Sequence, residues 1–155
     1  MRLPPDVRER LAREYRFVAG KIRDEQLPLR KVYFFSALFT EISRNLNWHW
    51  DSDLVLLHWV LQATHAALNS KLQSPTPWVN AASDEALVNR LGPIADNLAN
   101  YMEQGAKGRE FHSLIAQIAE LGYLATNHGG YVMEKGLVPN ATGLPSAQSP
   151  DAAPR

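Results

Sequence analysis

Apolar side chains recur at intervals of three and four residues along most of the chain, which is the period of an amphipathic helix and not of a strand. Five stretches between Val7 and Ala125 carry this rhythm. We expect helices over residues 5 to 20–26, 29–46, 51–72, 83–104 and 111–125. The Gly92–Pro93 pair predicts a kink or break in the fourth stretch. The expected fold class is therefore all-α, an irregular bundle of five to six helices.

Proline, glycine and acidic residues mark the expected helix boundaries. Pro5 and Asp6 suit a first helical turn, because a proline there leaves no N–H without a partner and a carboxylate favours the positive helix end. Pro28 predicts a break before the second stretch, and Asp51 fits the N-cap of the third. Gly105 indicates the turn that follows the fourth stretch.

The third stretch is unusual because apolar residues surround it. One face carries Leu54, Leu57, Leu61, Leu68 and Leu72, and the remainder carries Val55, Trp59, Val60 and Ala63. We expect this helix to lie at the centre of the bundle, with the second and fifth helices completing the core. A monomer of this size has difficulty burying such a helix, so the pattern also predicts a homodimer or a subunit of a larger assembly.

The last part of the chain has a different composition. Gly129 and Gly130 favour the end of the final helix, and proline, small and polar residues dominate from Gly136. Such a segment cannot bury enough apolar surface to offset the entropy of ordering. We expect a single helical domain over residues 1–135 and a disordered C-terminal tail over residues 136–155.

Composition excludes several classes of protein. The chain has 155 residues, one domain in length, and its 16 basic and 16 acidic residues cancel, which argues against a surface that is basic all over. It has no cysteine, so disulfides, thiolate metal ligands and a cysteine nucleophile are excluded. No apolar run approaches 18 residues and the N-terminus is charged, so we expect no membrane span, no signal peptide and a cytoplasmic location.

Charge is unevenly distributed along the chain. Residues 1–31 hold nine basic and five acidic residues, a balance of 9 − 5 = +4, which leaves 7 − 11 = −4 for the remainder. Arg8, Arg13 and Arg16 are therefore candidates for contact with a nucleic-acid backbone or an acidic partner. The alternative is that these arginines only solvate the outer side of the first helix.

A short motif joins the end of the second stretch to the start of the third. Arg44 is followed by the polar Asn45, and four residues stand between Arg44 and His49. This spacing resembles the motif of the HEPN family of all-helical ribonucleases. The resemblance implies metal-independent RNA cleavage, with His49 as general acid or base, Arg44 stabilising charge on the phosphate, and two motifs facing one cleft in a dimer. The alternative is an arginine that caps a helix C-terminus and a histidine in a loop.

Histidines and carboxylates also gather around this motif, which raises the question of a metal site. The group consists of Glu41, His49, Asp51, Asp53, His58 and His65. His58 and His65 share a helix face, but seven residues span roughly 10 Å along a helix, too far for both to bind one ion. We expect no metal and no cofactor.

Three tryptophans, Trp48, Trp50 and Trp59, cluster in the same region. Tryptophan is enriched at binding hot spots, so we assign these residues to partner binding. The alternative is that they plug the ends of the bundle. The function expected is a non-enzymatic helical interaction or accessory protein that docks on a partner or self-associates, with a nucleic-acid-associated assembly as one setting. The HEPN-like ribonuclease is the alternative function.

Overall fold

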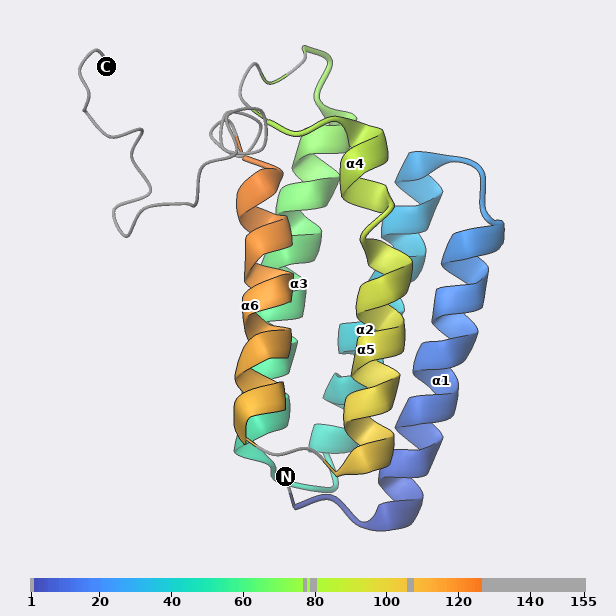
Figure 1. Ribbon diagram of the computed structural model, residues 1–155, viewed down its shortest axis with the longest axis vertical. Coiled ribbons are helices and arrows are strands. Elements are labelled where there is room, and N and C mark those ends of the chain that lie inside the picture. Colours follow the sequence, from blue (N-terminus) through green and yellow to red (C-terminus); the bar gives the residue numbers. More distant parts are fainter. Residues whose placement is uncertain (1, 77, 79–80, 106–107, 127–155) are drawn as a thin grey trace, which may run out of the picture.

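Five long helices and one short helix make up the structure, a computed structural model that describes residues 2–76, 78, 81–105 and 108–126 (Figure 1). The described residues contain no strand. The helices are α1 (Pro5–Asp24), α2 (Pro28–Leu46), α3 (Ser52–Gln73), α4 (Asp84–Val88), α5 (Leu91–Gln104) and α6 (Gly108–Leu124). The predicted all-α bundle is therefore confirmed. The predicted end of the last helix at Gly129–Gly130, the domain boundary at residue 135 and the disordered tail lie outside the described residues.

The long helices lie side by side around one core. In Figure 1, α1, α3 and α6 run in one direction, and α2 and α5 run in the other. Contacts join α5 to α1, α1 to α2, α2 to α3, and α3 to α6, while α5 and α6 also touch. The bundle is thus a ring of five long helices, and the short α4 lies at one end between α3 and α5 in sequence.

Most helix boundaries fall where the capping residues predict them. Asp51 is the N-cap of α3 and accepts hydrogen bonds from two backbone N–H groups of the first turn, and Ser83 is the N-cap of α4 and accepts one. Gly105 ends α5 with a φ of 64°. The break in the fourth stretch comes slightly earlier than expected: α4 ends at Val88 and α5 begins at Leu91, so Gly92–Pro93 lies inside the first turn of α5, where proline is tolerated.

The prediction that the third helix lies at the centre of the bundle is wrong. α3 packs between α2 and α6 and buries one side, with Leu54, Leu57, Leu61, Thr64 and Leu68 covered by the core. Its opposite side faces outward, since Leu56 is 47% and Trp59 is 65% exposed. The apolar pattern of a helix does not show which of its sides neighbouring helices cover. In this structure they cover one side of α3 and leave the other exposed.

Two glycines provide a test of the fold, because their backbones differ. Gly105 has a positive φ, and a Cβ there would lie 2.9 Å from Nη1 of Arg8, whereas Gly20 lies within α1 with open space around it. We expect Gly105→Ala to lower the free energy of unfolding by about 1–2 kcal/mol, and Gly20→Ala to raise it by roughly 0.4–1 kcal/mol. Urea unfolding of both variants measures the two effects. Equal effects in the same direction would contradict this geometry.

Candidate functional site

The outer side of α3 is unusual because it lacks charged residues over most of its length. From Leu54 to Ser70 the helix contains no Asp, Glu, Lys or Arg. The residues that point away from the core recur at spacings of three and four: Leu56, Trp59, Ala63, Ala66 and Ser70. All are exposed, and we call this set the α3 surface. A bundle helix normally places charged residues on its outer side, where they interact favourably with water. The α3 surface lacks these charged residues.

Both neighbouring helices continue this uncharged region. Ser36, Phe39 and Ser43 share one face of α2, and the Phe39 ring contacts the rings of His58 and His65 of α3 with centroids 5.9 and 5.4 Å apart.

On the other side, Ile115, Ala119 and Gly122 share one face of α6. A Cβ at Gly122 would lie 3.0 Å from Oγ1 of Thr64, so Gly122 packs closely against α3, and Ala119 is exposed one turn before it. The uncharged region therefore extends over parts of three helices.

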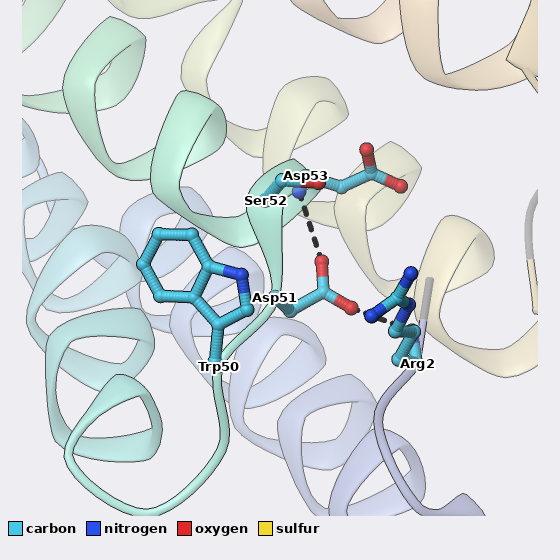
Figure 2. Close-up of a pocket in the computed structure, with 5 residues that line it drawn as sticks. All are labelled: Arg2, Trp50, Asp51, Ser52 and Asp53. Atoms are coloured by element: carbon cyan, nitrogen blue, oxygen red, sulfur yellow. Dashed lines mark hydrogen bonds between the residues drawn. The ribbon is translucent and has the colours of Figure 1, made fainter.

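The predicted tryptophans are exposed and do not plug the bundle. Trp59 is part of the α3 surface, while Trp48 and Trp50 lie on the connection between α2 and α3 and are 84% and 70% exposed. Figure 2 shows the Trp50 ring on the opposite side of the chain from the carboxylate of Asp51. The structure thus places all three indoles where another molecule can reach them, although partner binding by these residues stays a prediction.

A small polar hollow of about 200 Å³ lies at the start of α3, lined by Arg2, Trp50, Asp51, Ser52 and Asp53 (Figure 2). Asp51 is buried, and its carboxylate accepts hydrogen bonds from the backbone N–H groups of Asp53 (2.9 Å), Leu54 (3.1 Å) and Arg2. This carboxylate therefore fixes the N-terminal segment to the first turn of α3.

Tyr101 of α5 contacts one of the residues that line this hollow. Its hydroxyl donates a hydrogen bond to Oδ2 of Asp53 at 3.3 Å. Burial, and then the neighbouring Asp53 carboxylate, raise the pKa of Tyr101 well above its ordinary value. The phenol is thus held protonated as a hydrogen-bond donor. The hydrogen bond between Tyr101 and Asp53 therefore has a structural role, and no pattern in the sequence predicted it.

The HEPN-like motif spans the end of α2 and the connection to α3, where His49 stands between Trp48 and Trp50. Arg44, in the last turn of α2, forms an ion pair with Glu41 of its own helix. The backbone N–H of His49 donates to the Asn45 carbonyl at 2.9 Å. Among the described residues, no hydrogen bond or ion pair joins the side chains of Arg44 and His49. Their catalytic role stays a prediction.

The candidate arginines of α1 differ in their surroundings. Nη1 of Arg8 donates to the Met102 carbonyl at 3.1 Å, and Arg16 forms an ion pair with Glu103. These two side chains therefore link α1 to α5. Arg13 is exposed and forms no ion pair within the described part of the chain. Nucleic-acid binding by the three arginines stays a prediction, and Arg13 is the one that the intramolecular contacts leave available.

The histidine and carboxylate group does not converge. In the described residues, no three His, Asp or Glu side chains are close enough together to hold a metal ion. His58 and His65 instead flank Phe39 with edge-on ring contacts. These two histidines contribute to the packing of α3 against α2.

His65 provides a prediction on pH dependence. Its imidazole is half-buried, and burial lowers its pKa, an effect that a hydrogen bond to the Val32 carbonyl partly offsets. The unfolded chain therefore takes up a proton near pH 6.5 that the folded chain does not. We expect the free energy of unfolding to fall as the pH drops below this value, and His65→Gln to reduce that dependence. Urea unfolding at pH 7.5 and 5.5 measures it, with the exposed His112→Gln as control. An equal slope in the His65→Gln variant would contradict the prediction.

A second hollow, of about 320 Å³, lies between α5 and α6 and was not predicted. Four carboxamide side chains contribute to its lining, together with other polar and charged residues such as Arg109: Asn97, Asn100, Gln104 and Gln117. Nδ2 of Asn97 donates to Oε1 of Gln117 at 2.9 Å. The spacing of the three α5 carboxamides is a sequence signal for one polar helix face, but only the structure shows which helix faces it.

Comparisons with protein-family models, with curated protein sequences and with solved structures found no match to this chain. Within the part of the chain that the structure describes, none of the helices has the length and apolar character needed to cross a membrane.

Proposed function

We propose that the protein is a non-enzymatic helical interaction protein that docks on another protein through the α3 surface. The single observation that supports this proposal is the combination of an exposed outer side with 17 consecutive residues, Leu54–Ser70, that carry no formal charge. Contiguous exposed apolar area of this kind is uncommon on proteins that act alone, and it is typical of interaction sites. Trp59 supplies the aromatic anchor that such sites use.

The other helices provide the contrast that gives this observation weight. The outer side of α1 carries Arg10, Arg13 and Glu14, and that of α6 carries Glu110 and Glu120, all exposed. These faces interact favourably with water, and they follow the amphipathic pattern of an ordinary bundle. Exposed apolar side chains also occur on α1 and α2, such as Phe17 and Tyr33, but they stand among charged residues such as Lys21 and Arg30. The uncharged outer side is therefore a local feature of α3.

The proposal predicts a loss of assembly when charge is placed on the α3 surface. In native extract, the wild-type chain is expected to elute at a mass above its own 17.4 kDa. The double variant Leu56→Lys, Trp59→Lys is expected to elute as the free chain, because a buried lysine without a partner is strongly unfavourable. Its far-ultraviolet circular dichroism is expected to remain that of the wild type, since both positions are exposed in the isolated chain.

Phe17→Lys is the matched control, because Phe17 is an apolar side chain of similar exposure, 62%, on a different helix, α1. This variant is expected to assemble as the wild type does. The proposal is wrong if the double variant keeps the wild-type mass, or if the wild type elutes as the free chain.

The second function, metal-independent RNA cleavage through Arg44 and His49, is favoured by one observation. Arg44 is exposed in the last turn of α2, and it is followed in the sequence by Trp48 and Trp50, whose exposed indoles are available to stack on bases. It predicts RNA cleavage in EDTA that is lost in both Arg44→Ala and His49→Ala. Intact RNA with the wild type, or cleavage by both variants, excludes this function.

A further inference from the structure

The side chains of the α3 surface are ordered by size. The N-terminal half carries the large Leu56 and Trp59, and the C-terminal half carries the small Ala63, Ala66 and Ser70. The spacing between successive members is three, four, three and four residues, which is the heptad spacing at which two helices pack along one seam.

We propose that a second copy of this chain covers the α3 surface, with the two α3 helices antiparallel and the two-fold axis beside Ala63. This inference rests on the proposed function, since it names the partner of the same surface. In this arrangement Trp59 packs over Ala66 of the second copy and Leu56 packs over Ser70 of the second copy. Each large side chain thus meets a small one, which is the alternation that interdigitated packing requires. A parallel arrangement would instead stack Trp59 on Trp59 and leave space between the alanines.

Electrostatics favours a second copy over a charged partner. A two-fold axis brings the residues beside it near their own equivalents, so any charged residue close to the axis would meet the same charge. No such residue exists between Leu54 and Ser70, and the flanking positions Ser36, Ser43 and Ala119 are also uncharged. The antiparallel direction adds the favourable pairing of opposite helix dipoles. A strongly acidic or basic partner surface would gain no ion pair here.

The size of the region is sufficient for a stable dimer. α3 has 22 residues and is therefore about 33 Å long at 1.5 Å per residue. Neighbouring helices lie roughly 8–10 Å apart, so α3 and its flanks on α2 and α6 form a strip about 20 Å wide. An area of that order is comparable to the roughly 800 Å² that each partner contributes to a standard interface.

The absence of cysteine from the chain makes the geometry directly testable. Single cysteines are introduced into the full-length chain at Ala63, at Ser70 and, as control, at Ala116, an exposed alanine on the outer side of α6. Under mild oxidation, Ala63→Cys is expected to form a covalent dimer at least about tenfold faster than Ala116→Cys, because its equivalent lies across the axis. Ser70→Cys alone is expected to form no covalent crosslink within its dimer, but to form a covalent dimer when mixed with Leu56→Cys.

Sedimentation of the purified chain provides the second readout. The wild type is expected to form dimers, and Trp59→Lys to weaken the dimer by at least about thirtyfold, as for a hot-spot residue. Phe17→Lys is expected to leave it unchanged.

Three outcomes would overturn the inference, and they separate it from the proposed function. Self-crosslinking of Ser70→Cys would indicate parallel helices. A wild type that remains monomeric by sedimentation, together with equally slow crosslinking of Ala63→Cys and Ala116→Cys, would exclude the second copy. If the Leu56→Lys, Trp59→Lys variant still loses its assembly in extract, the proposed function stands and only the identity of the partner is wrong. If it does not, both proposals fail.

Discussion

The Leu61→Ala variant is expected to lose about 3 kcal/mol of its free energy of unfolding, within the 2–5 kcal/mol typical of a buried leucine. Leu61 lies on α3 with no exposed surface, enclosed by the contacts of α3 with α2 and α6. Truncation removes its apolar contacts and leaves a cavity that packed helices cannot close. Urea unfolding at low protein concentration, where association does not contribute, measures the loss.

Leu56→Ala in the same helix is the matched control. Leu56 is 47% exposed, so its truncation is expected to cost less than about 1 kcal/mol in the isolated chain. The pair compares one residue type on the two sides of one helix, covered and uncovered. Similar losses for the two variants would mean that α3 is rotated, or that it is enclosed as the central helix that its composition suggests.

The second large effect is expected at Asp51. Asp51→Ala removes an N-cap, which costs about 1 kcal/mol, and leaves the backbone N–H of Arg2 without its partner, which adds roughly 1–2 kcal/mol. We expect a total loss of about 2–3 kcal/mol in urea unfolding. Hydrogen exchange at the amide of Leu54 is expected to accelerate, because the first turn of α3 loses its acceptor.

Ser83→Ala is the control for Asp51. Ser83 is also an N-cap, but its side chain accepts from a single backbone N–H, that of Ala86 at 3.2 Å. Its replacement is expected to cost about 1 kcal/mol or less. If Asp51→Ala costs no more than Ser83→Ala, the link between the N-terminal segment and α3 does not stabilise the fold.

The sequence predicts the helices themselves well, because their determinants are local. Capping and breaking residues act within one turn of the backbone. Pro28 therefore begins α2, Asp51 precedes α3 and Gly105 ends α5, all as the pattern predicts. The break before α5 is displaced by only a few residues, since proline is acceptable within a first turn.

The position of α3 in the bundle could not be predicted, because it depends on which helices lie beside it. The sequence says only that apolar residues surround this helix, and two arrangements satisfy that pattern. Either neighbours enclose the helix, or another molecule covers the exposed side. The packing of α6 against Thr64 and of α2 against His65 determines which side of α3 is covered. Both are contacts between residues far apart in sequence.

The candidate site was predicted in part for the same reason. Trp48, Trp50 and Trp59 could be selected by residue type, but their exposure depends on the absence of a covering helix. The role of Arg8 was not evident, because its acceptor is the Met102 carbonyl, 94 positions away. The hydrogen bond from Tyr101 to Asp53 likewise joins α5 to α3 and leaves no local pattern.

The central claim is that another molecule covers the α3 surface, and the rate of thiol labelling at Ala63→Cys tests it most directly. The chain has no other cysteine, so a maleimide reports on this position alone, and Ala116→Cys provides the rate for an exposed position on α6. In the native assembly we predict that Ala63→Cys is labelled at least about tenfold more slowly than Ala116→Cys, and that adding Trp59→Lys restores its rate. Equal labelling rates at the two positions in the native assembly would contradict the account.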